Sequence, residues 1–446
     1  MSAALHAKFG TIQATVLATQ KRPGRLHLLL IAIAFGFAAV GGLSWAMMIR
    51  NGMYYTGLNS PVCWGVLITD FVFWVGIAHS GTLISAVLFL FRAKFRTAVY
   101  RAAEAMTVIG VMTAGLFPII HLGRPWFFYW LFPYPNQRHL WINFRSPLIW
   151  DVFAVSTYFI VSSIFLVVGM VPDVAALRDA SSGWRQRLYA VLAFGWRGTD
   201  EEWRHYTRAY GYLAAFATPL VISVHSVVAW DFAVSIVPGW HSTLFPPYFV
   251  AGAIFSGVAL VVLLLIPLRR SLELEGIVTM KHLDMLARLV LATSLVVTYS
   301  YIAEFAIALA GPPTPERSTL VYRATGPYAP VFWLMVFCNC ASPLTLFLAR
   351  VRASTRALTA VMIGVVVGMW LERFVIVVTS LTHDRLPFSW RLYVPQPMEL
   401  AITAGSFGWF FFWFLLFVRF LPAVSISELK EEAAHEAAHA EAAHAG

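Results

Sequence analysis

The sequence predicts an all-α integral membrane protein with ten transmembrane helices. The chain is 59% hydrophobic and only 12% charged, and its mean hydropathy of +0.71 lies far above that of soluble domains of this length. Apolar segments of about 20 residues, the length that crosses a hydrocarbon core, recur along almost the whole chain. We expect the ten helices at 26–49, 62–91, 102–122, 147–171, 210–237, 247–268, 283–311, 329–350, 356–382 and 398–421.

The distribution of basic residues predicts the orientation of these helices. Cytoplasmic loops retain Lys and Arg, so we expect both termini in the cytoplasm. With that orientation, 23 of the 32 Lys and Arg residues lie in the inner flanks, at 1–25, 92–101, 172–209, 269–288, 350–356 and 419–446. The net charge of +10 reflects this asymmetry and attraction to phospholipid, and it indicates no nucleic-acid partner.

The ten spans are expected to form one transmembrane domain between two short terminal segments. Residues 1–25 lack the apolar core of a signal peptide, so we interpret them as a cytoplasmic segment before an uncleaved anchor. The transmembrane domain covers 26–422, and the Ala/Glu/His-rich residues 423–446 are expected to be a disordered cytoplasmic tail. Within the domain we predict two four-helix bundles, flanked by one helix at each end, at about 62–237 and 247–382.

A weak internal repeat underlies the two-bundle prediction. The span 62–91 carries Ser80-Gly81 before a basic turn, and the span 247–268 carries Ser256-Gly257 in the same way. Pro147 and Trp150 open one later helix, and Pro330 and Trp333 open another 183 residues on. At this offset Glu304 replaces His121 and Leu334 replaces Asp151, so we expect the second bundle to lack the site described next.

His121 and Asp151 form the candidate site with the clearest chemistry. His121 closes one span and Asp151 opens the next, so a helical hairpin can bring both side chains to the outer membrane face. Pro118 kinks the first helix one turn before the histidine, and the aromatic run 126–132 can form a shelf at the interface. Arg124, between His121 and this run, could hold an acid ionised or anchor a partner subunit.

Further ionisable residues lie at membrane depth, where a central Asp or Arg costs roughly 2.5–3.5 kcal/mol. Glu372 and Arg373 are sequence neighbours on different helix faces, so we expect each to have a partner on another helix. The remaining groups of this kind are Asp70, His79, His225, Asp231 and Glu304. Structural pairing is the simple alternative to a functional role for each of them.

The sequence indicates no redox cofactor and no metal site within this chain. Cys63, Cys338 and Cys340 provide no four-ligand set for an iron–sulfur cluster and are interpreted as packing residues. The histidines clearly inside spans are each alone in their helix, so no paired ladder indicates haem. An imidazole and a carboxylate beside aromatic rings could accept the two protons released when a quinol is oxidised. The electrons must then pass to another polypeptide.

Six sequence stretches resemble the NrfD family, the polysulfide reductase membrane subunits. They are WGVLITD (64–70), GIAHSGTLIS (76–85), RAAEAMT (101–107), HLGRPW (121–126), LEGIVT (274–279) and YSYIAE (299–304). The resemblance covers about 25–425. Within the family, the chain most resembles the larger NrfD-like subunit of bacterial alternative complex III.

The resemblance implies a quinol:cytochrome c oxidoreductase subunit that binds menaquinol or a similar quinol on the periplasmic side. It implies His121 and Asp151 as quinol ligands, with Asp70, His79 and Arg124 as neighbours. The expected partners are an iron–sulfur subunit on the periplasmic face, c-type cytochromes and a second NrfD-like membrane subunit. The other ionisable residues then become candidates for a proton path: Glu104, His225, Asp231, Glu304, Glu372 and Arg373.

Two other functions stay open on the sequence alone. A proton- or ion-coupled secondary transporter would also use two repeats and buried acids, which should then cluster around one midplane cavity. A passive membrane anchor for a periplasmic oxidoreductase would need the acids only for assembly. The number of costly buried groups argues against a passive anchor.

Overall fold

The computed structural model describes residues 3–20, 24–91, 93, 96–133, 146–311 and 314–445. The all-α prediction is confirmed: the described residues form helices, turns and loops without a strand, and ten helical segments are long and apolar enough to cross a membrane. These segments are α2 (Arg25–Asn51), α3 with its continuation (Val66–Leu90), α5 (Tyr100–His121), α6 (Pro147–Asp179), α8 (Asp200–Ala233), α9 (Phe245–Ser271), α10 (Met280–Ala310), α12 with its continuation (Ala329–Phe347), α15 with its continuation (Thr355–Thr382) and α17 (Pro397–Phe420).

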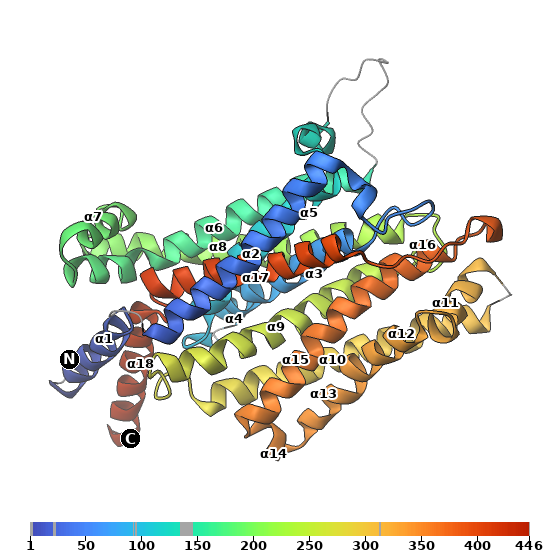
Figure 1. Ribbon diagram of the computed structural model, residues 1–446. Helices are drawn as coiled ribbons and strands as arrows, with labels where there is room; N and C mark the ends of the chain where they lie inside the picture. Colours follow the sequence, from blue (N-terminus) through green and yellow to red (C-terminus); the bar gives the residue numbers. More distant parts are fainter. Residues whose placement is uncertain are drawn as a thin grey trace.

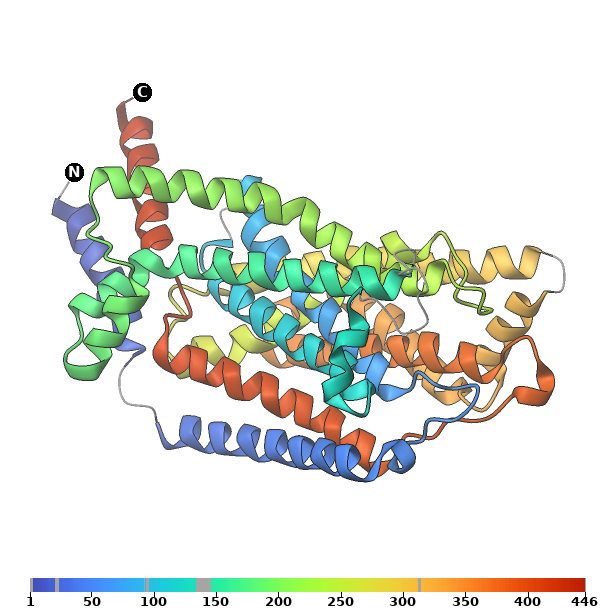
Figure 2. The same cartoon turned by 90° about the horizontal axis from the view of Figure 1, so that it is seen from above.

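The spanning helices pack as two groups of four with a peripheral pair (Figures 1 and 2). Helices α3, α5, α6 and α8 form bundle one, and α9, α10, α12 and α15 form bundle two. The two bundles meet mainly where α3 packs against α9. The first and last spans, α2 and α17, lie side by side along one edge (Figure 2).

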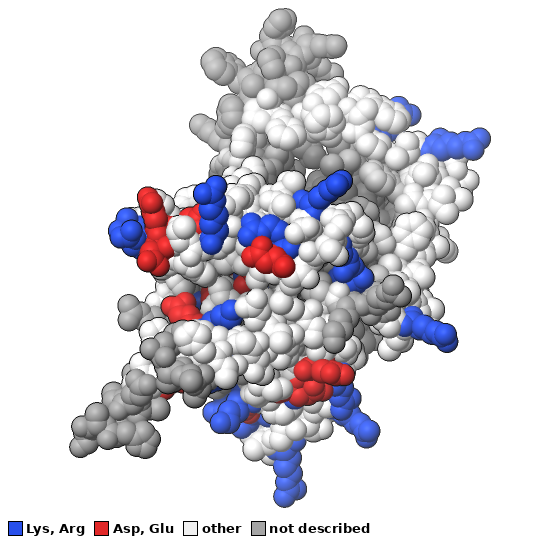
Figure 3. Space-filling model, turned by 90° about the vertical axis from the view of Figure 1, so that its left-hand side faces the viewer, with Lys and Arg blue, Asp and Glu red and all other residues white. Residues whose placement is uncertain are grey.

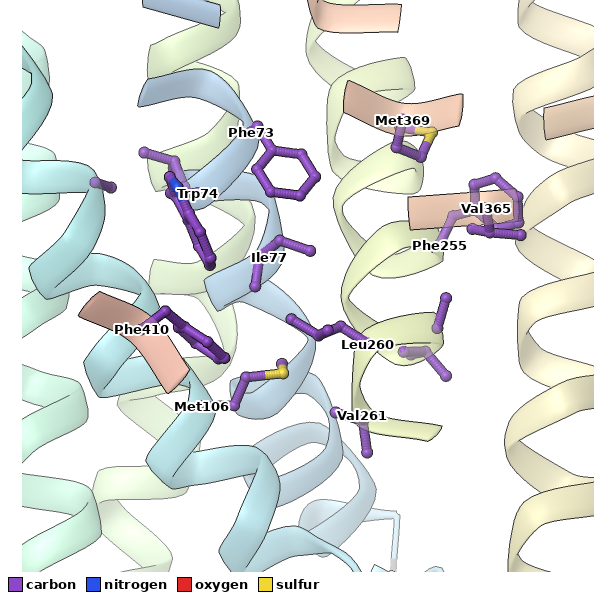
Figure 4. Packing of buried hydrophobic residues seen from close by; sticks show 14 of the residues in the cluster. Phe73, Trp74, Ile77, Met106, Phe255, Leu260, Val261, Val365, Met369 and Phe410 are labelled. Atoms are coloured by element: carbon purple, nitrogen blue, oxygen red, sulfur yellow. The ribbon is translucent and has the colours of Figure 1, made fainter. Parts of the chain in front are cut away.

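Small residues allow α3 and α9 to approach closely at the contact between the bundles. A Cβ atom added to Gly257 would lie 2.3 Å from Ser80 Oγ and 2.7 Å from the Ile77 carbonyl oxygen. The Ser-Gly motifs that suggested the repeat therefore bring the two bundles together, as small residues do at helix contacts in membranes. Figure 4 shows Phe73 and Ile77 of α3 between these two helices. On another side of α3, the Trp74 ring lies beside Phe410 of α17, with ring centroids 4.9 Å apart.

The membrane-spanning helices α6 and α8 are longer than the sequence predicted. Helix α6 continues to Asp179, and α8 begins at Asp200, where Thr199 and Glu202 form a capping box. Between them lies α7 (Gly183–Leu192), which packs on α6. The charged inner flank 172–209 is therefore mostly helical.

The terminal segments gather at one end of the molecule (Figure 1). Helices α1 (Ala3–Ala18), α7 and α18 (Ile426–Ala445) lie at this end, whereas α11 (Pro315–Thr325) and α16 (Ser380–Thr382) lie at the other. Lys and Arg side chains project around the end with the termini (Figure 3). This arrangement agrees with the basic flanks that the sequence assigned to one side.

The tail expected to be disordered is helical, which corrects that prediction. The Asp173 carboxylate accepts hydrogen bonds from the backbone N–H groups of Ile426 (3.1 Å) and Ser427 (3.0 Å) and so caps α18. Glu428 forms an ion pair with Arg96 at 2.7 Å. Burial raises the pKa of the Glu428 carboxyl, and the charge of Arg96 opposes this rise. A composition typical of a frayed segment thus becomes ordered because α6 offers a buried carboxylate to its first turn.

The contact between α2 and α17 provides a test of this packing. A Cβ atom on Gly41 would lie 2.7 Å from the Gly405 Cα, whereas one on the adjacent Gly42 would meet nothing within 4 Å. We expect Gly41→Leu to destabilise the protein by about 1–3 kcal/mol because the two backbones must separate. Gly42→Leu is the matched control and should be nearly neutral. Thermal denaturation of both purified variants measures the difference, and equal midpoints would contradict the predicted contact.

Candidate functional site

His121 is the last residue of α5 and lies beside an aromatic 3₁₀ segment. Helix α5 continues through Pro118 to His121, and Pro125–Leu131 then forms the 3₁₀ segment η4. The rings of Phe127 and Trp130 stack in this segment with centroids 4.5 Å apart. The His121 Nδ1 atom is buried and has no hydrogen-bond partner among the described residues. An unpaired imidazole nitrogen is therefore available beside an apolar, aromatic surface.

Asp151 pairs with a second carboxyl group that the sequence did not connect with it. Asp151 is 6% exposed in the first turns of α6, and its side chain is hydrogen-bonded to Asp231, near the end of α8. The neighbouring rings of Trp150 and Trp230 are in edge-to-face contact at 5.8 Å. A hydrogen bond between two carboxyl groups requires that one of them carries a proton. The Asp151–Asp231 pair can therefore hold and release a proton.

The structure sets His121 and the acid pair at the ends of neighbouring helices. The end of α5 and the start of α6 adjoin through η4, which contacts both helices. No hydrogen bond or ion pair joins His121 to Asp151 among the described residues. Asp151 and Asp231 are partners of each other at this end of bundle one. An unpaired His121 nitrogen and a buried carboxyl pair thus lie at this end of bundle one, and joint binding of one ligand stays a prediction.

Asp70 and His79, expected as neighbours of this site, have other partners. Asp70 is fully buried and accepts hydrogen bonds from Trp370 Nε1 (2.7 Å) and Thr403 Oγ1 (2.6 Å). It thereby joins α3 to α15 and α17. His79 Nδ1 lies 2.8 Å from the Val75 carbonyl oxygen in the same helix. Arg124 is exposed and forms no ion pair with Asp151 among the described residues.

The structure brings together two histidines that stood alone in their helices. The rings of His79 and His225 are in contact, with centroids 4.5 Å apart. The His225 ring also packs on Phe249, and the Arg373 guanidinium lies 4.3 Å from the centroid of the same phenylalanine ring. A buried polar group in each bundle therefore contacts Phe249.

Glu104 belongs to a buried charge cluster at the end that carries the termini. Arg101 forms ion pairs with Glu104 and Asp173, both at 3.1 Å, and Tyr210 donates a hydrogen bond to Glu104. All these side chains are buried. The cluster links α5, α6 and α8, and its connection to α18 runs through Asp173. Arg101 and Asp173 were not singled out from the sequence, where they resemble ordinary flanking charges.

The acids of bundle two are also paired. Glu304 forms an ion pair with Arg323 of α11 at 2.9 Å. Glu372 contacts its neighbour Arg373 at 2.7 Å and accepts a hydrogen bond from Tyr301 of α10. Glu372 and Arg373 interact with other helices as expected, but the two also contact each other, which the sequence did not predict. The π-helical segment Val375–Thr379 follows directly and changes the helical phase beside this pair.

Arg323 and Glu399 are buried ionisable groups that were not predicted from the sequence. Besides Glu304, Arg323 donates hydrogen bonds to Thr379, Ser380 and the Gly239 carbonyl oxygen. Glu399 accepts hydrogen bonds from Tyr393 and the Gly57 backbone. Arg323 lies in α11, between two spans, and Glu399 lies in the first turn of the last span. A search for charged residues inside apolar segments therefore does not find them. The Gln396–Glu399 capping-box spacing was the one available sign for Glu399.

A small cavity lies in bundle two beside these pairs. Its volume is about 20 Å³, and it is lined by Tyr248, Tyr301, Glu304, Arg323 and Glu372 on its polar side and by apolar residues elsewhere. Bundle two therefore has a polar interior although it lacks a counterpart of Asp151. Among the described residues, no three His, Cys, Asp or Glu side chains are grouped so that they could hold a metal ion.

Comparison with known proteins finds similarity to membrane subunits of oxidoreductases. The family model described as "Polysulphide reductase, NrfD" matches residues 54–383. The chain is 28% identical over 53% of its length to a putative membrane subunit of the dimethyl sulfoxide reductase of Halobacterium salinarum, covering 49% of that protein. It is 24% identical over 86% of its length to a subunit of the selenate reductase of Mesobacillus selenatarsenatis, covering 92% of that protein.

A third relative is the Hdr-like menaquinol oxidoreductase integral membrane subunit of Archaeoglobus fulgidus. The chain is 26% identical to it over 51% of its own length and covers 48% of that protein. The chain thus spans about half the length of two of these three curated relatives and most of the selenate reductase subunit.

Proposed function

Because the chain belongs to the polysulphide reductase NrfD family, we propose that it is the quinol-binding and quinol-oxidising membrane subunit of a respiratory oxidoreductase complex. The observation that carries this proposal is the unpaired His121 nitrogen and the Asp151–Asp231 carboxyl pair at the helix ends that adjoin the aromatic segment η4. A quinol offers two hydroxyl donors on a planar apolar ring, and this site offers two acceptors near aromatic side chains. Menaquinol is named in the description of the Archaeoglobus relative as a menaquinol oxidoreductase subunit.

The proposed reaction divides the two protons of the quinol between the two parts of the site. One quinol hydroxyl donates its proton to the His121 imidazole, and the other donates to the Asp151–Asp231 pair in its singly protonated or ionised form. The two electrons leave to an acceptor in a partner subunit, and the quinone is released. Each turnover therefore transfers two protons to this chain and two electrons out of it. The aromatic shelf excludes water from the ring and positions it.

The proposed partners follow from the resemblance to alternative complex III. An iron–sulfur subunit on the periplasmic face would accept the electrons, and c-type cytochromes would carry them to cytochrome c, with a second NrfD-like subunit in the membrane. The names of the three relatives support an oxidoreductase complex in general, and none of these names is that of an alternative complex III subunit. We place the complex in the bacterial inner membrane with both termini in the cytoplasm.

Coupled proton movement would use the buried groups outside the quinol site. The candidates are Glu104, His225, Asp231, Glu304, Glu372 and Arg373, of which Asp231 adjoins the site itself. The secondary-transporter alternative expects these acids around one midplane cavity. Glu104 instead belongs to a cluster at the end with the termini, and Asp151 and Asp231 lie at the opposite end of bundle one. This separation favours a site at one membrane face over a single transport cavity.

Substitution of His121 tests the proposed site. In the purified complex, we expect His121→Phe to lower quinol-dependent reduction of the partner's redox centres by about 10²-fold or more, because the variant lacks the proton acceptor. His241→Phe is the control, since His241 is an exposed histidine in the loop after α8. Subunit composition is checked by gel. Normal turnover of an intact His121→Phe complex would contradict the proposal, and loss of subunits would instead support a passive anchor.

A further inference from the structure

Two arginines from distant parts of the chain converge at the end that carries the termini. Arg185 of α7 and Arg419 in the last turn of α17 each donate a hydrogen bond to the backbone carbonyl oxygen of Gln20, both at 3.3 Å. Gln20 itself is held in place because its side-chain amide donates to the Leu421 carbonyl oxygen at 3.1 Å. Three segments, after α1, in α7 and at the end of α17, therefore meet at one point.

The charges at this point favour the binding of an anion. Two guanidinium groups on one oxygen atom repel each other. Arg185 forms no ion pair with a carboxylate among the described residues. Guanidinium groups bind phosphate oxygens in a planar, two-pronged geometry. A phosphate group beside Arg185 and Arg419 would relieve the repulsion and accept hydrogen bonds from Arg185.

The surroundings indicate that this phosphate belongs to a lipid. Trp184 is 62% exposed and its ring contacts Phe420 at 6.2 Å, which is the aromatic arrangement of a membrane interface. Arg185 lies over both rings, at 5.6 and 5.9 Å. The first turns of α2 adjoin Arg419 through His27 and present exposed apolar side chains, which are Leu26, Leu29, Leu30 and Ile33. Acyl chains can lie along this surface while the headgroup contacts the arginines.

We propose that Arg185, Arg419 and Trp184 form a binding site for an anionic phospholipid at the membrane face that carries the termini. Basic pockets between transmembrane helices on the cytoplasmic side bind lipids of this class. The bound lipid would add to the contact between α7 and the end of α17, where Tyr189 donates a hydrogen bond to the Phe420 carbonyl oxygen at 2.8 Å. This inference is independent of the proposed quinol chemistry, because the site lies at the opposite end of the spans from His121.

Lipid binding to the purified protein in detergent tests the proposal. Native mass spectrometry after titration with phosphatidylglycerol measures the bound fraction, with phosphatidylcholine as the neutral lipid. We expect phosphatidylglycerol to bind more tightly, and Arg185→Gln and Arg419→Gln to weaken its binding about fivefold each. Arg187→Gln is the matched control, since Arg187 is an exposed arginine on the same helix, and it should bind like the unmodified protein.

The outcomes distinguish a lipid site from a site for free anions and from unspecific binding. Equal binding of phosphatidylglycerol by all variants would overturn the proposal, and so would equal binding of the neutral lipid. Inorganic phosphate is tested as a competitor, and displacement of phosphatidylglycerol by millimolar phosphate would show a site for free anions instead. If the glutamine variants fold poorly, Arg185→Lys is used in their place. It keeps the positive charge, so we expect it to retain most of the binding of phosphatidylglycerol. We also expect the unmodified protein to bind less phosphatidylglycerol as the salt concentration rises, because salt screens the attraction between the arginines and the headgroup.

Discussion

Replacing Asp151 by asparagine is expected to abolish quinol oxidation in a complex that remains assembled. Asparagine keeps the size of the side chain and can hydrogen-bond to Asp231, but it cannot accept a proton. The carboxyl pair would lose its capacity to share and release one, so we expect turnover to fall by about 10²–10⁴-fold. The measurement is quinol:cytochrome c oxidoreductase activity of the purified complex, with each subunit quantified on a gel.

Two further variants define what this result means. Asp179→Asn is the control, because Asp179 ends the same helix at the opposite side of the membrane with its side chain 68% exposed. Asp231→Asn should lower activity less than Asp151→Asn if Asp151 contacts the quinol and Asp231 acts through it. Retained activity in an intact Asp151→Asn complex would move the quinol site to another subunit. A loss of the proposed partner subunits would show that the acid pair serves assembly.

Replacing Arg101 by methionine is expected to cause the largest loss of stability. Arg101 is fully buried and pairs with both Glu104 and Asp173. Methionine fills a similar volume but leaves two buried carboxyl groups without their cation, which typically costs about 3–5 kcal/mol. The helices α5, α6, α8 and α18 all contact this cluster, so we expect a lower midpoint of thermal denaturation and faster proteolysis of α18.

Arg178→Met is the matched control for this prediction. Arg178 lies near the same end of the molecule and pairs with the exposed Asp179 at 2.8 Å, so its removal should change stability by no more than about 1 kcal/mol. The triple variant Arg101→Met, Glu104→Gln, Asp173→Asn should recover part of the loss, because the neutral amides need no cation. Equal midpoints for Arg101→Met and Arg178→Met would contradict a structural role for the buried cluster.

The positions of the spanning helices could be predicted closely from the sequence. The expected span 26–49 is α2 (Arg25–Asn51), and the expected span 398–421 is α17 (Pro397–Phe420). Hydropathy and length suffice here because every backbone polar group in a membrane must be satisfied within the helix itself. Errors occurred where helices leave the membrane, as at α6 and α8, because caps such as Thr199–Glu202 then set the boundaries.

The partners of the buried polar residues could not be predicted in the same way. Asp151 pairs with Asp231 and Glu304 with Arg323, and Asp70 bonds to residues of α15 and α17. No local pattern identifies these partners, since they lie on other helices. The same reason explains the tail: its composition is that of a frayed segment, and only Asp173 and Arg96 of distant helices make its first turns ordered.

The sequence by itself therefore determined the class of the protein, its ten spans, the basic bias of one side and the residues most costly to bury. These follow from transfer free energies, which depend on each side chain and its nearest neighbours in the chain. Only the tertiary structure decided which buried groups pair with one another, as Asp151 and Asp231 do, and which keep an unpaired atom, as His121 does. In a medium without water each polar group must find its partner through space, so helix packing selects the groups that remain free for chemistry.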